Sequence, residues 1–420
     1  MDTAEVFAKK FFSNRIGGEN FGKTSKIYKF EKIKRAKRAA MNKYPDRTIL
    51  DMGIGEPDVM ADQIVIQTLF DEANKFENRG YADNGCYEFK VAIASYMKQM
   101  FHVELDPDKE ILHSIGSKSA LSILPLCFIN PGDTVLMTVP GYGVFGTHAK
   151  YLGADIVNLP LCKKNKFLPE IETLSPEILQ KTKLLVLNYP NNPTGAICTR
   201  DFYSKVVEFA HKYNFLIIAD AAYSALTFDP NDRLSILQID SAKEVALELH
   251  SMSKGFNMTG WRIGWVCGNE YLIRAYGNVK DNTDSGQFLP IQKAAAKILG
   301  KLDIPQNNAS RYSRRMDKVI EIFNTHGMRF EKPKAGFFIY SNIPSMAVVN
   351  KETFSFQSAE QFSEWAIEKL GIILVPWDDA DHAIRLSMTF TTPDMNEEQM
   401  LNALEQRLLG IEFLYQGSHL

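Results

Sequence analysis

A lysine flanked by small hydroxyl residues is the feature of this sequence best suited to chemistry. In HSMSKGFNMTGWRIGWV, residues 250–266, Lys254 follows an apolar run and lies close to Ser251 and Ser253. Arg262 comes eight positions after the lysine. A lysine amine can act as a nucleophile toward a carbonyl carbon, and an arginine offers paired N–H donors to an anion. Taken alone, such a segment is more often a solvated loop, so its meaning depends on what accompanies it.

Polar side chains also follow two apolar runs upstream of this lysine. Asp220 ends the run FLIIAD, Tyr223 comes three residues later, and Asn192 lies in NYPNNPTG just after the run KLLVLN. Each has an ordinary alternative role: a helix cap for Asp220, a core tyrosine at 223 and a turn residue at 192. A carboxylate buried at a strand end nevertheless needs a cation or good hydrogen bonds. The tyrosine hydroxyl and the asparagine amide can both donate hydrogen bonds to an oxyanion.

An anion site is indicated by HSIGSKSALSIL, residues 113–124. This pattern is typical of a strand end, a tight turn at Gly116 and a helix start, so the backbone N–H groups of Ser117 and Lys118 would face an anion. The hydroxyls and the guanidinium of the lysine segment could complete that cage. Tyr142, in VPGYG after the run TVLMTV, could stack on a planar ring, although an aromatic residue after Pro-Gly is more often plain loop packing.

Together these side chains meet the four demands that pyridoxal phosphate makes on a protein. The cofactor needs a lysine that forms an imine with its aldehyde carbon and an acid that faces its pyridine nitrogen. It also needs donors to its phenolate oxygen and a phosphate cage of hydroxyls, backbone N–H groups and an arginine. All four roles can be filled by residues at successive strand ends. This favours a cofactor site over the alternative that each residue separately serves as a cap, turn or packing residue.

The elements that must position these residues alternate along the chain. Six apolar runs are predicted as strands, at 134–139, 154–159, 183–188, 215–220, 245–250 and 262–267. Because the runs are nearly continuous and are separated by helix-length segments, they predict an α/β fold with a mainly parallel, seven-stranded-type sheet buried on both faces. Ligands bind at the carboxyl ends of such strands, where Asn192, Asp220 and Lys254 fall.

The chain length and a change in the pattern of predicted helices and strands both predict more than one domain. A chain of 420 residues exceeds the size at which a single core keeps growing. After about residue 300 the pattern changes to a smaller α+β arrangement. We therefore predict an N-terminal arm and part of a small domain over residues 1–60, a large cofactor-binding domain over 61–300, and a small C-terminal domain over 301–420.

The composition and charge of the chain argue against several classes of partner and site. A net charge of −2 argues against nucleic acid or an anionic membrane as the main partner, and the basic stretch between Lys9 and Arg47 is interpreted as a solvated amphipathic arm. Five scattered cysteines without a CxxC pair suit free thiols in a reducing compartment. The sequence has no local histidine metal motif, no apolar run long enough to span a bilayer and no signal-peptide pattern. We expect a cytoplasmic enzyme without a metal.

These motifs resemble those of the fold-type I pyridoxal-phosphate aminotransferases of classes I and II. The matching segments, between residues 51 and 390, are GIGEPD, GYADNG, GSKSAL, PGYGVFG, NYPNNPTG, ADAAY, SMSKGFNMTGWRIGW and AIRLSMTF. The resemblance implies that Lys254 forms the imine and shuttles the proton, and that Asp220 pairs with the ring nitrogen. The further cofactor ligands it implies are Ser117, Lys118, Tyr142, Asn192, Tyr223, Ser251, Ser253 and Arg262. It also implies a homodimer with shared active sites, in which Tyr81 reaches the phosphate of the neighbouring subunit.

Within that superfamily, the segments GENFGKTSKIYKFEKIKRAKRA, VKDNTDSGQFLPIQKA and VPWDDADHAIRLSMTF are similar to those of LL-diaminopimelate aminotransferases. Such enzymes reversibly exchange an amino group between LL-diaminopimelate and 2-oxoglutarate, with tetrahydrodipicolinate and glutamate on the other side, in lysine biosynthesis. The resemblance implies that Arg385, helped by the backbone near Gly55, holds the substrate α-carboxylate. The side chains considered for the distal end of the substrate are Tyr28, Asp83, Asn84, Lys118 and Ser285, with Asn192 also near the substrate.

Three alternatives remain open at this point. The first is an aminotransferase specific for aspartate, alanine or aromatic amino acids. The second is a pyridoxal-phosphate lyase on the same fold. The third is a regulator that binds the cofactor without turnover, although the matching segments leave little of the chain for an added DNA-binding domain.

Overall fold

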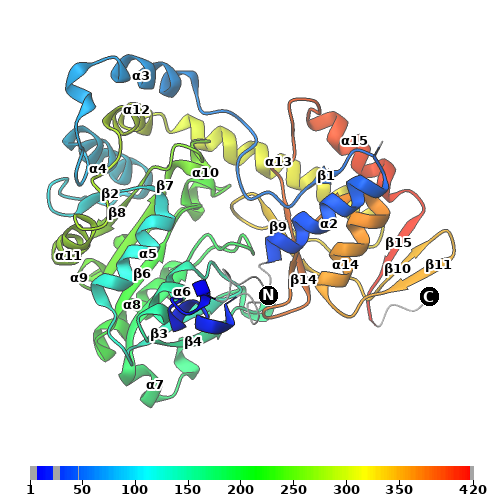
Figure 1. The fold of residues 1–420 in the computed structure, drawn as a ribbon, viewed down its shortest axis with the longest axis horizontal. Helices are drawn as coiled ribbons and strands as arrows, with labels where there is room; N and C mark the ends of the chain where they lie inside the picture. The colour runs from blue at the N-terminus through cyan, green and yellow to red at the C-terminus, as the bar shows by residue number, and fades with distance from the viewer. Residues whose placement is uncertain (1–6, 22–28, 46, 417–420) are drawn as a thin grey trace.

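The protein has two lobes, each with its own sheets and helices (Figure 1). The computed structural model describes residues 7–21, 29–45 and 47–416. Tyr28, a predicted substrate contact, lies outside the described residues. The lobe that contains most of the middle of the chain carries a seven-stranded sheet, and the other combines the C-terminal part of the chain with a segment near its N-terminus.

The large sheet has the strand order β2-β8-β7-β6-β5-β3-β4. All its neighbouring pairs are parallel except those of β8, which is antiparallel to both β2 and β7. The predicted mainly parallel sheet is therefore confirmed, with each of the six predicted strands present within two residues at either end. The strands are β2 (Ile111–Ser114), β3 (Thr134–Val139), β4 (Asp155–Pro160), β5 (Thr182–Asn188), β6 (Leu216–Asp220), β7 (Ala246–Ser251) and β8 (Gly264–Gly268).

Helices cover both faces of this sheet, so successive apolar residues of a central strand are buried on opposite faces. In β5, for example, Leu184 belongs to the hydrophobic cluster on one face and Leu185 to the cluster on the other. One face packs against α5 (Gly116–Phe128), α6 (Val144–Tyr151) and α11 (Glu270–Lys280). The other packs against α4 (Tyr87–Phe101), α8 (Arg200–Tyr213) and α12 (Leu289–Leu299), and α3 (Gln63–Ala73) lies against α12.

The second lobe contains three small sheets. An antiparallel sheet has the order β13-β14-β9, with β9 (Phe338–Asn342), β13 (Val375–Trp377) and β14 (Ala383–Ser387). A second has the order β11-β10-β15, with β10 (Met346–Val349), β11 (Glu352–Ser355) and β15 (Ile411–Leu414). The third pairs β1 (Leu50–Asp51) in parallel with β12 (Ile372–Ile373), so a segment from the N-terminal part of the chain becomes part of the second lobe. The helices are α2 (Lys29–Lys43), α13 (Asp303–Thr325), α14 (Ala359–Trp365) and α15 (Glu397–Leu408).

The helix α13 runs from one lobe into the other (Figure 1) and carries a buried cation. Arg315 is 3% exposed and donates hydrogen bonds to Asp58 at 2.8 Å and to the Met388 carbonyl at 2.7 Å. Its Nε donates to Glu397 at 2.8 Å. These contacts fix the segment GIGEPD relative to the second lobe. The division of the chain at residues 60 and 300 stays a prediction.

Two further properties concern membranes and metals. No helix in the described part of the chain is long and apolar enough to cross a membrane. Among the residues that the structure describes, no group of three or more His, Cys, Asp or Glu side chains is arranged to hold a metal ion.

Candidate active site

A cavity of about 330 Å³ lies at the carboxyl ends of the parallel strands in the large sheet. Phe338 of β9 and Arg385 of β14 line it from the second lobe. Its size falls in the range of small-molecule and cofactor sites. The predicted site residues that line it are Gly55, Ser117, Lys118, Tyr142, Asn192, Asp220, Tyr223, Ser251, Ser253, Lys254, Arg262 and Arg385. The structure thus brings together residues that the sequence distributes over 331 positions, from 55 to 385, counting both ends.

Lys254 lies in the short helix α10 (Met252–Gly255), directly after β7. Its ammonium nitrogen donates a hydrogen bond to the Gly55 carbonyl at 2.7 Å. Burial lowers the pKa of the Lys254 amine to about 8, against the opposing effect of the Glu56 carboxylate. A lysine with a lowered pKa has a larger neutral fraction near pH 7, and the neutral amine is the form that can attack a carbonyl or accept a proton.

Asp220 is the last residue of β6 and is 4% exposed. Its Oδ1 accepts a hydrogen bond from the Ala222 backbone N–H at 3.2 Å, so the side chain does stabilise the turn after the strand. Burial raises the pKa of the Asp220 carboxyl to about 6. Within the described ranges, no lysine or arginine forms an ion pair with this carboxyl. A cationic group bound in the cavity would supply the charge that a buried carboxylate needs.

Two asparagines at the end of β5 connect these elements. Asn188, the last residue of the strand, donates to the Asp220 carbonyl at 3.0 Å and accepts from the Asn192 backbone N–H at 2.9 Å. The Asn192 side-chain oxygen in turn accepts from Arg385 at 3.1 Å. Arg385 also donates to the Gly53 carbonyl at 3.0 Å, and its guanidinium lies 4.0 Å from the centre of the Phe338 ring. Arg385 is therefore held in one place by contacts from both lobes.

One end of the cavity is formed by the N-terminus of α5 and by Arg262. Gly116, the first residue of α5, has φ +73°, and a Cβ added there would lie 2.6 Å from the Arg262 guanidinium. A side chain at this position would displace the guanidinium, and the positive φ also favours glycine. Arg262 itself donates to the Thr259 carbonyl at 2.9 Å and to the Ser253 hydroxyl at 3.4 Å. Unpaired helix N–H groups beside a guanidinium form a site for an anion.

The two predicted aromatic residues both line the cavity. Tyr223 packs against Phe337 and Phe338, with ring centres 5.5 and 5.7 Å apart. Burial raises the pKa of the Tyr223 hydroxyl, so this group stays a hydrogen-bond donor. Tyr142 lines the cavity from the loop between β3 and α6.

Other predicted site residues lie elsewhere. Tyr81 is 85% exposed, and neither it nor Asp83 is among the residues that line the cavity. Asn84 donates to Asp281 at 2.6 Å, and Ser285 lies on the surface. Roles for Tyr81 and Asp83 in a shared active site stay predictions about a neighbouring subunit.

Sequence reasoning missed several residues of the cavity wall. These are Glu56, Asn188, Ala222, Thr259 and Phe338. Asn188 could have been found, because it ends a predicted strand, as Asp220 does. No spacing signal distinguished Thr259 or Phe338, whose positions depend on how the chain folds back onto the cavity.

Comparison with known proteins gives the family. The family model for aminotransferases of class I and II matches residues 47–406. The chain belongs to the class I and II aminotransferases. This aminotransferase is 46% identical to an LL-diaminopimelate aminotransferase of Methanocaldococcus jannaschii, over 98% of its own chain and 100% of the relative. It is 36% identical to one of Moorella thermoacetica, over 92% of its chain and 97% of the relative.

Solved structures agree with this assignment. The substrate-bound structure of BacF from Bacillus subtilis superimposes on this aminotransferase with a TM-score of 0.85 at 29% identity, covering 96% of this chain and 99% of that one. The predicted fold-type I architecture is confirmed. Class I and II aminotransferases depend on pyridoxal phosphate, so the predicted cofactor is confirmed at the level of the family.

The cavity of this aminotransferase fits that cofactor. It offers a lysine amine with a lowered pKa, a buried carboxyl that would be stabilised by a cation, and an anion site at the N-terminus of α5. These three groups match the aldehyde, the ring nitrogen and the phosphate of one small molecule.

Proposed function

We propose that this aminotransferase transfers an amino group between LL-diaminopimelate and 2-oxoglutarate, with tetrahydrodipicolinate and glutamate as the other pair. The observation that carries the proposal is the 46% identity to an LL-diaminopimelate aminotransferase along the whole chain. A cavity that holds Lys254, Asp220 and Arg385 together supports it, because transamination requires an amine, a partner for the ring nitrogen and a site for a carboxylate.

In this proposal the cofactor is held at five places. Lys254 forms the covalent link to the aldehyde, and Asp220 keeps the ring nitrogen protonated. The Asn192 amide and the Tyr223 hydroxyl donate to the phenolate oxygen, and Tyr142 packs on the ring face. The phosphate is held by the N-terminus of α5, with Ser117 and Lys118, and by Ser251, Ser253 and Arg262.

Bound pyridoxal phosphate supplies a ring that accepts the electrons released when the substrate α-carbon loses its proton. The protein supplies orientation and proton transfer. Arg385 binds the α-carboxylate and so fixes the orientation of the substrate α-carbon in the cavity. The substrate amine first displaces Lys254 from its covalent link, and the freed Lys254 amine then accepts the α-proton and returns it, as a positioned general base and acid. Burial lowers the pKa of this amine to about 8 in the cofactor-free protein, which favours that role.

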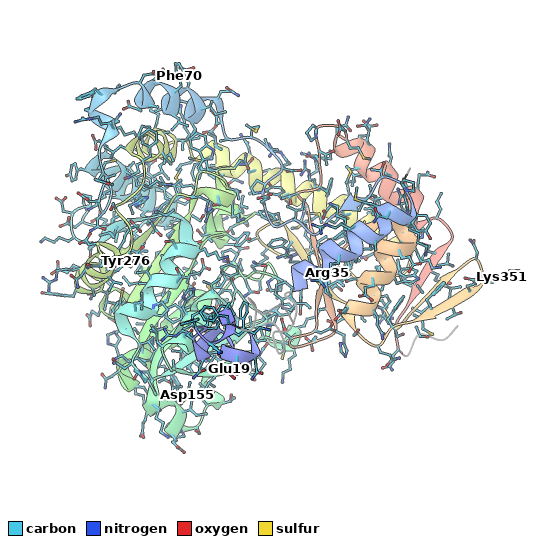
Figure 2. The ribbon with its side chains drawn as sticks, in the orientation of Figure 1. Glu19, Arg35, Phe70, Asp155, Tyr276 and Lys351 are labelled. Carbon is cyan, nitrogen blue, oxygen red and sulfur yellow. The ribbon has the colours of Figure 1, made fainter. Side chains whose placement is uncertain are left out.

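The proposal includes a homodimer with shared active sites. Large apolar side chains are exposed on the segment that contains Tyr81: Phe70 is 65% and Phe76 is 75% exposed. Phe70 lies on α3 at the outer margin of the large lobe (Figure 2). Large exposed apolar side chains are one feature of surfaces that contact a partner. In the dimer, Tyr81 and Asp83 would contribute to the neighbouring cavity, with Asp83 near the distal end of the substrate.

The proposal is tested by comparing amino donors. The purified protein, loaded with pyridoxal phosphate, is assayed with 2-oxoglutarate and LL-diaminopimelate, aspartate, alanine or phenylalanine, and glutamate is measured. We expect kcat/KM for LL-diaminopimelate to exceed the others by about 100-fold or more, because a site built for a second charged end rejects substrates that lack it. The meso isomer is the matched control substrate. A preference for a common amino acid would exclude the proposed substrate.

A further inference from the structure

Gln287 connects two segments that meet at the anion end of the cavity. Its side-chain NH₂ group donates to the Trp261 carbonyl and to the Arg262 carbonyl, at 2.8 Å each. Its side-chain oxygen lies 2.8 Å from Nε2 of His113. Since the two carbonyls can only accept, they fix the orientation of the amide, and the His113 Nε2–H must be the donor in the third hydrogen bond.

The histidine supports this arrangement because it is buried and neutral. His113 is 0% exposed, and burial lowers the pKa of its imidazole to about 4. It lies on β2, which leads through Ser114 into the turn at Gly116, and the Ser114 hydroxyl donates to the Gly116 carbonyl at 2.8 Å. Gln287 is therefore tied to the strand that ends at the N-terminus of α5.

The two hydrogen bonds from the Gln287 NH₂ group act on a segment whose backbone is strained. Arg262 has φ +55°, a left-handed conformation that costs free energy for any residue except glycine. Gln287 donates to the carbonyl of the preceding residue, Trp261, and to the carbonyl of Arg262 itself, so the peptide groups on both sides of the Arg262 Cα are held. The direction in which the Arg262 side chain leaves the backbone follows from these two peptide groups.

Gln287 is itself anchored by buried groups. Its backbone carbonyl accepts from Gln292, which is 0% exposed, at 2.7 Å. One residue earlier, the Gly286 N–H donates to Asp284 at 2.8 Å, and Asp284 pairs with the buried Lys280 at 2.6 Å. A support that is fixed in this way can hold the strained segment in place.

We propose that Gln287 is a positioning residue for Arg262 and thereby sets the affinity of the protein for the cofactor phosphate. Gln287 does not line the cavity, so it acts through the arginine. The inference rests on the proposed function, in which Arg262 is a phosphate ligand. The ring and the aldehyde bind at other residues and do not depend on Gln287.

The test compares two ligands that share ring and aldehyde and differ in the phosphate. The full-length protein, freed of cofactor, is titrated with pyridoxal phosphate and with pyridoxal, and the ratio of the two dissociation constants is measured. Gln287→Ala should lower the preference for the phosphate form on the order of tenfold, about the effect of one charge-assisted hydrogen bond, and leave pyridoxal affinity unchanged. Gln287→Met keeps the length of the side chain and serves if the alanine variant fails to fold.

Two controls make the result specific. Arg262→Gln removes the guanidinium and should lower the ratio at least as far. Gln99→Ala changes an exposed glutamine on α4 and should keep the wild-type ratio. If both Gln287 variants keep the wild-type ratio while Arg262→Gln loses it, or if they weaken both ligands equally, the positioning role is overturned. An unchanged ratio in Arg262→Gln would instead overturn the proposed phosphate ligand and this inference with it.

Discussion

The guanidinium of Arg385 donates a hydrogen bond of 3.1 Å to the side-chain oxygen of Asn192, although 193 positions separate the two residues in sequence. Arg385 belongs to β14 of the small sheet, and Asn192 follows β5 of the large one. The bond therefore joins the two lobes at the cavity. A cation held at this place is where the carboxylate of a substrate can be bound in a fixed orientation.

Arg385→Lys should impair both halves of the reaction. Lysine cannot reproduce the planar pair of donors, so kcat/KM should fall about 10- to 100-fold for the amino acid and for the keto acid, mainly through KM. Steady-state kinetics with each substrate varied in turn measure this. Arg314→Lys, at an exposed arginine that pairs with Glu397, is the control and should change neither constant. Unchanged constants in Arg385→Lys would place the carboxylate site elsewhere.

Asp220 should make the cofactor-free protein less stable as pH rises. Burial raises the pKa of this carboxyl from 3.8 to about 6, so folding disfavours its ionised form. Relative to Asp220→Asn, the free energy of unfolding of the wild type should fall between pH 4 and 6, by about 3 kcal/mol in all. Below pH 4 the penalty is absent, because both folded and unfolded carboxyls are protonated.

Urea unfolding of the two proteins over this pH range provides the measurement. Saturation with pyridoxal phosphate should remove the fall, because a protonated ring nitrogen favours the carboxylate. A stability difference that does not change with pH, in the absence of cofactor, would contradict the assignment of a buried carboxyl without a cation.

Gly116→Ala should weaken cofactor binding through a steric conflict. The new Cβ would lie 2.6 Å from the Arg262 guanidinium. Alanine at this position would also have to adopt the positive φ of Gly116, +73°. Gly132→Ala is a matched control, because Gly132 has φ +86° and no atom within 4 Å of an added Cβ. Both variants should lose about 1 kcal/mol of stability, and only Gly116→Ala should raise the dissociation constant of pyridoxal phosphate. Equal affinities in the two variants would show that the turn does not contact the phosphate.

Asp58→Ala should destabilise the folded protein, because it leaves the buried Arg315 without one of its anions. Both side chains of this pair are 4% exposed. The expected loss is roughly 3 kcal/mol in the free energy of unfolding, as for other buried pairs that lose one partner. Asp232→Ala, in the exposed pair with Lys334, should cost less than about 1 kcal/mol. Equal costs in chemical denaturation would show that burial of the Asp58 pair has no special weight.

The sequence predicted those parts of the site that depend on strand ends. Asn192, Asp220 and Lys254 each follow an apolar run, and parallel strands bring their carboxyl ends to one edge of a sheet. Nearly continuous apolar runs, separated by helix-length segments, were enough to predict that arrangement. Gly116 was predicted as a turn for a similar reason, because a strand, a glycine and a helix start follow one another.

Other parts could not be predicted from one sequence. The bond between Arg385 and Asn192 depends on how the two lobes pack, which no local pattern contains. The hydrogen bond from Gln287 to the Arg262 carbonyl depends on how the loop between α11 and α12 packs against the Arg262 segment. Tyr81 was predicted only through a resemblance, and its side chain is 85% exposed, so its role in a neighbouring active site stays a prediction.

The most direct test of the proposed site identifies the lysine that binds the cofactor. The protein loaded with pyridoxal phosphate is treated with borohydride, which fixes the cofactor to its lysine, and the modified peptide is identified by mass spectrometry. The added mass should be found on Lys254, and Lys254→Ala should lack both this modification and the visible absorbance of the bound cofactor. Modification of a different lysine, or wild-type absorbance in Lys254→Ala, would contradict the account.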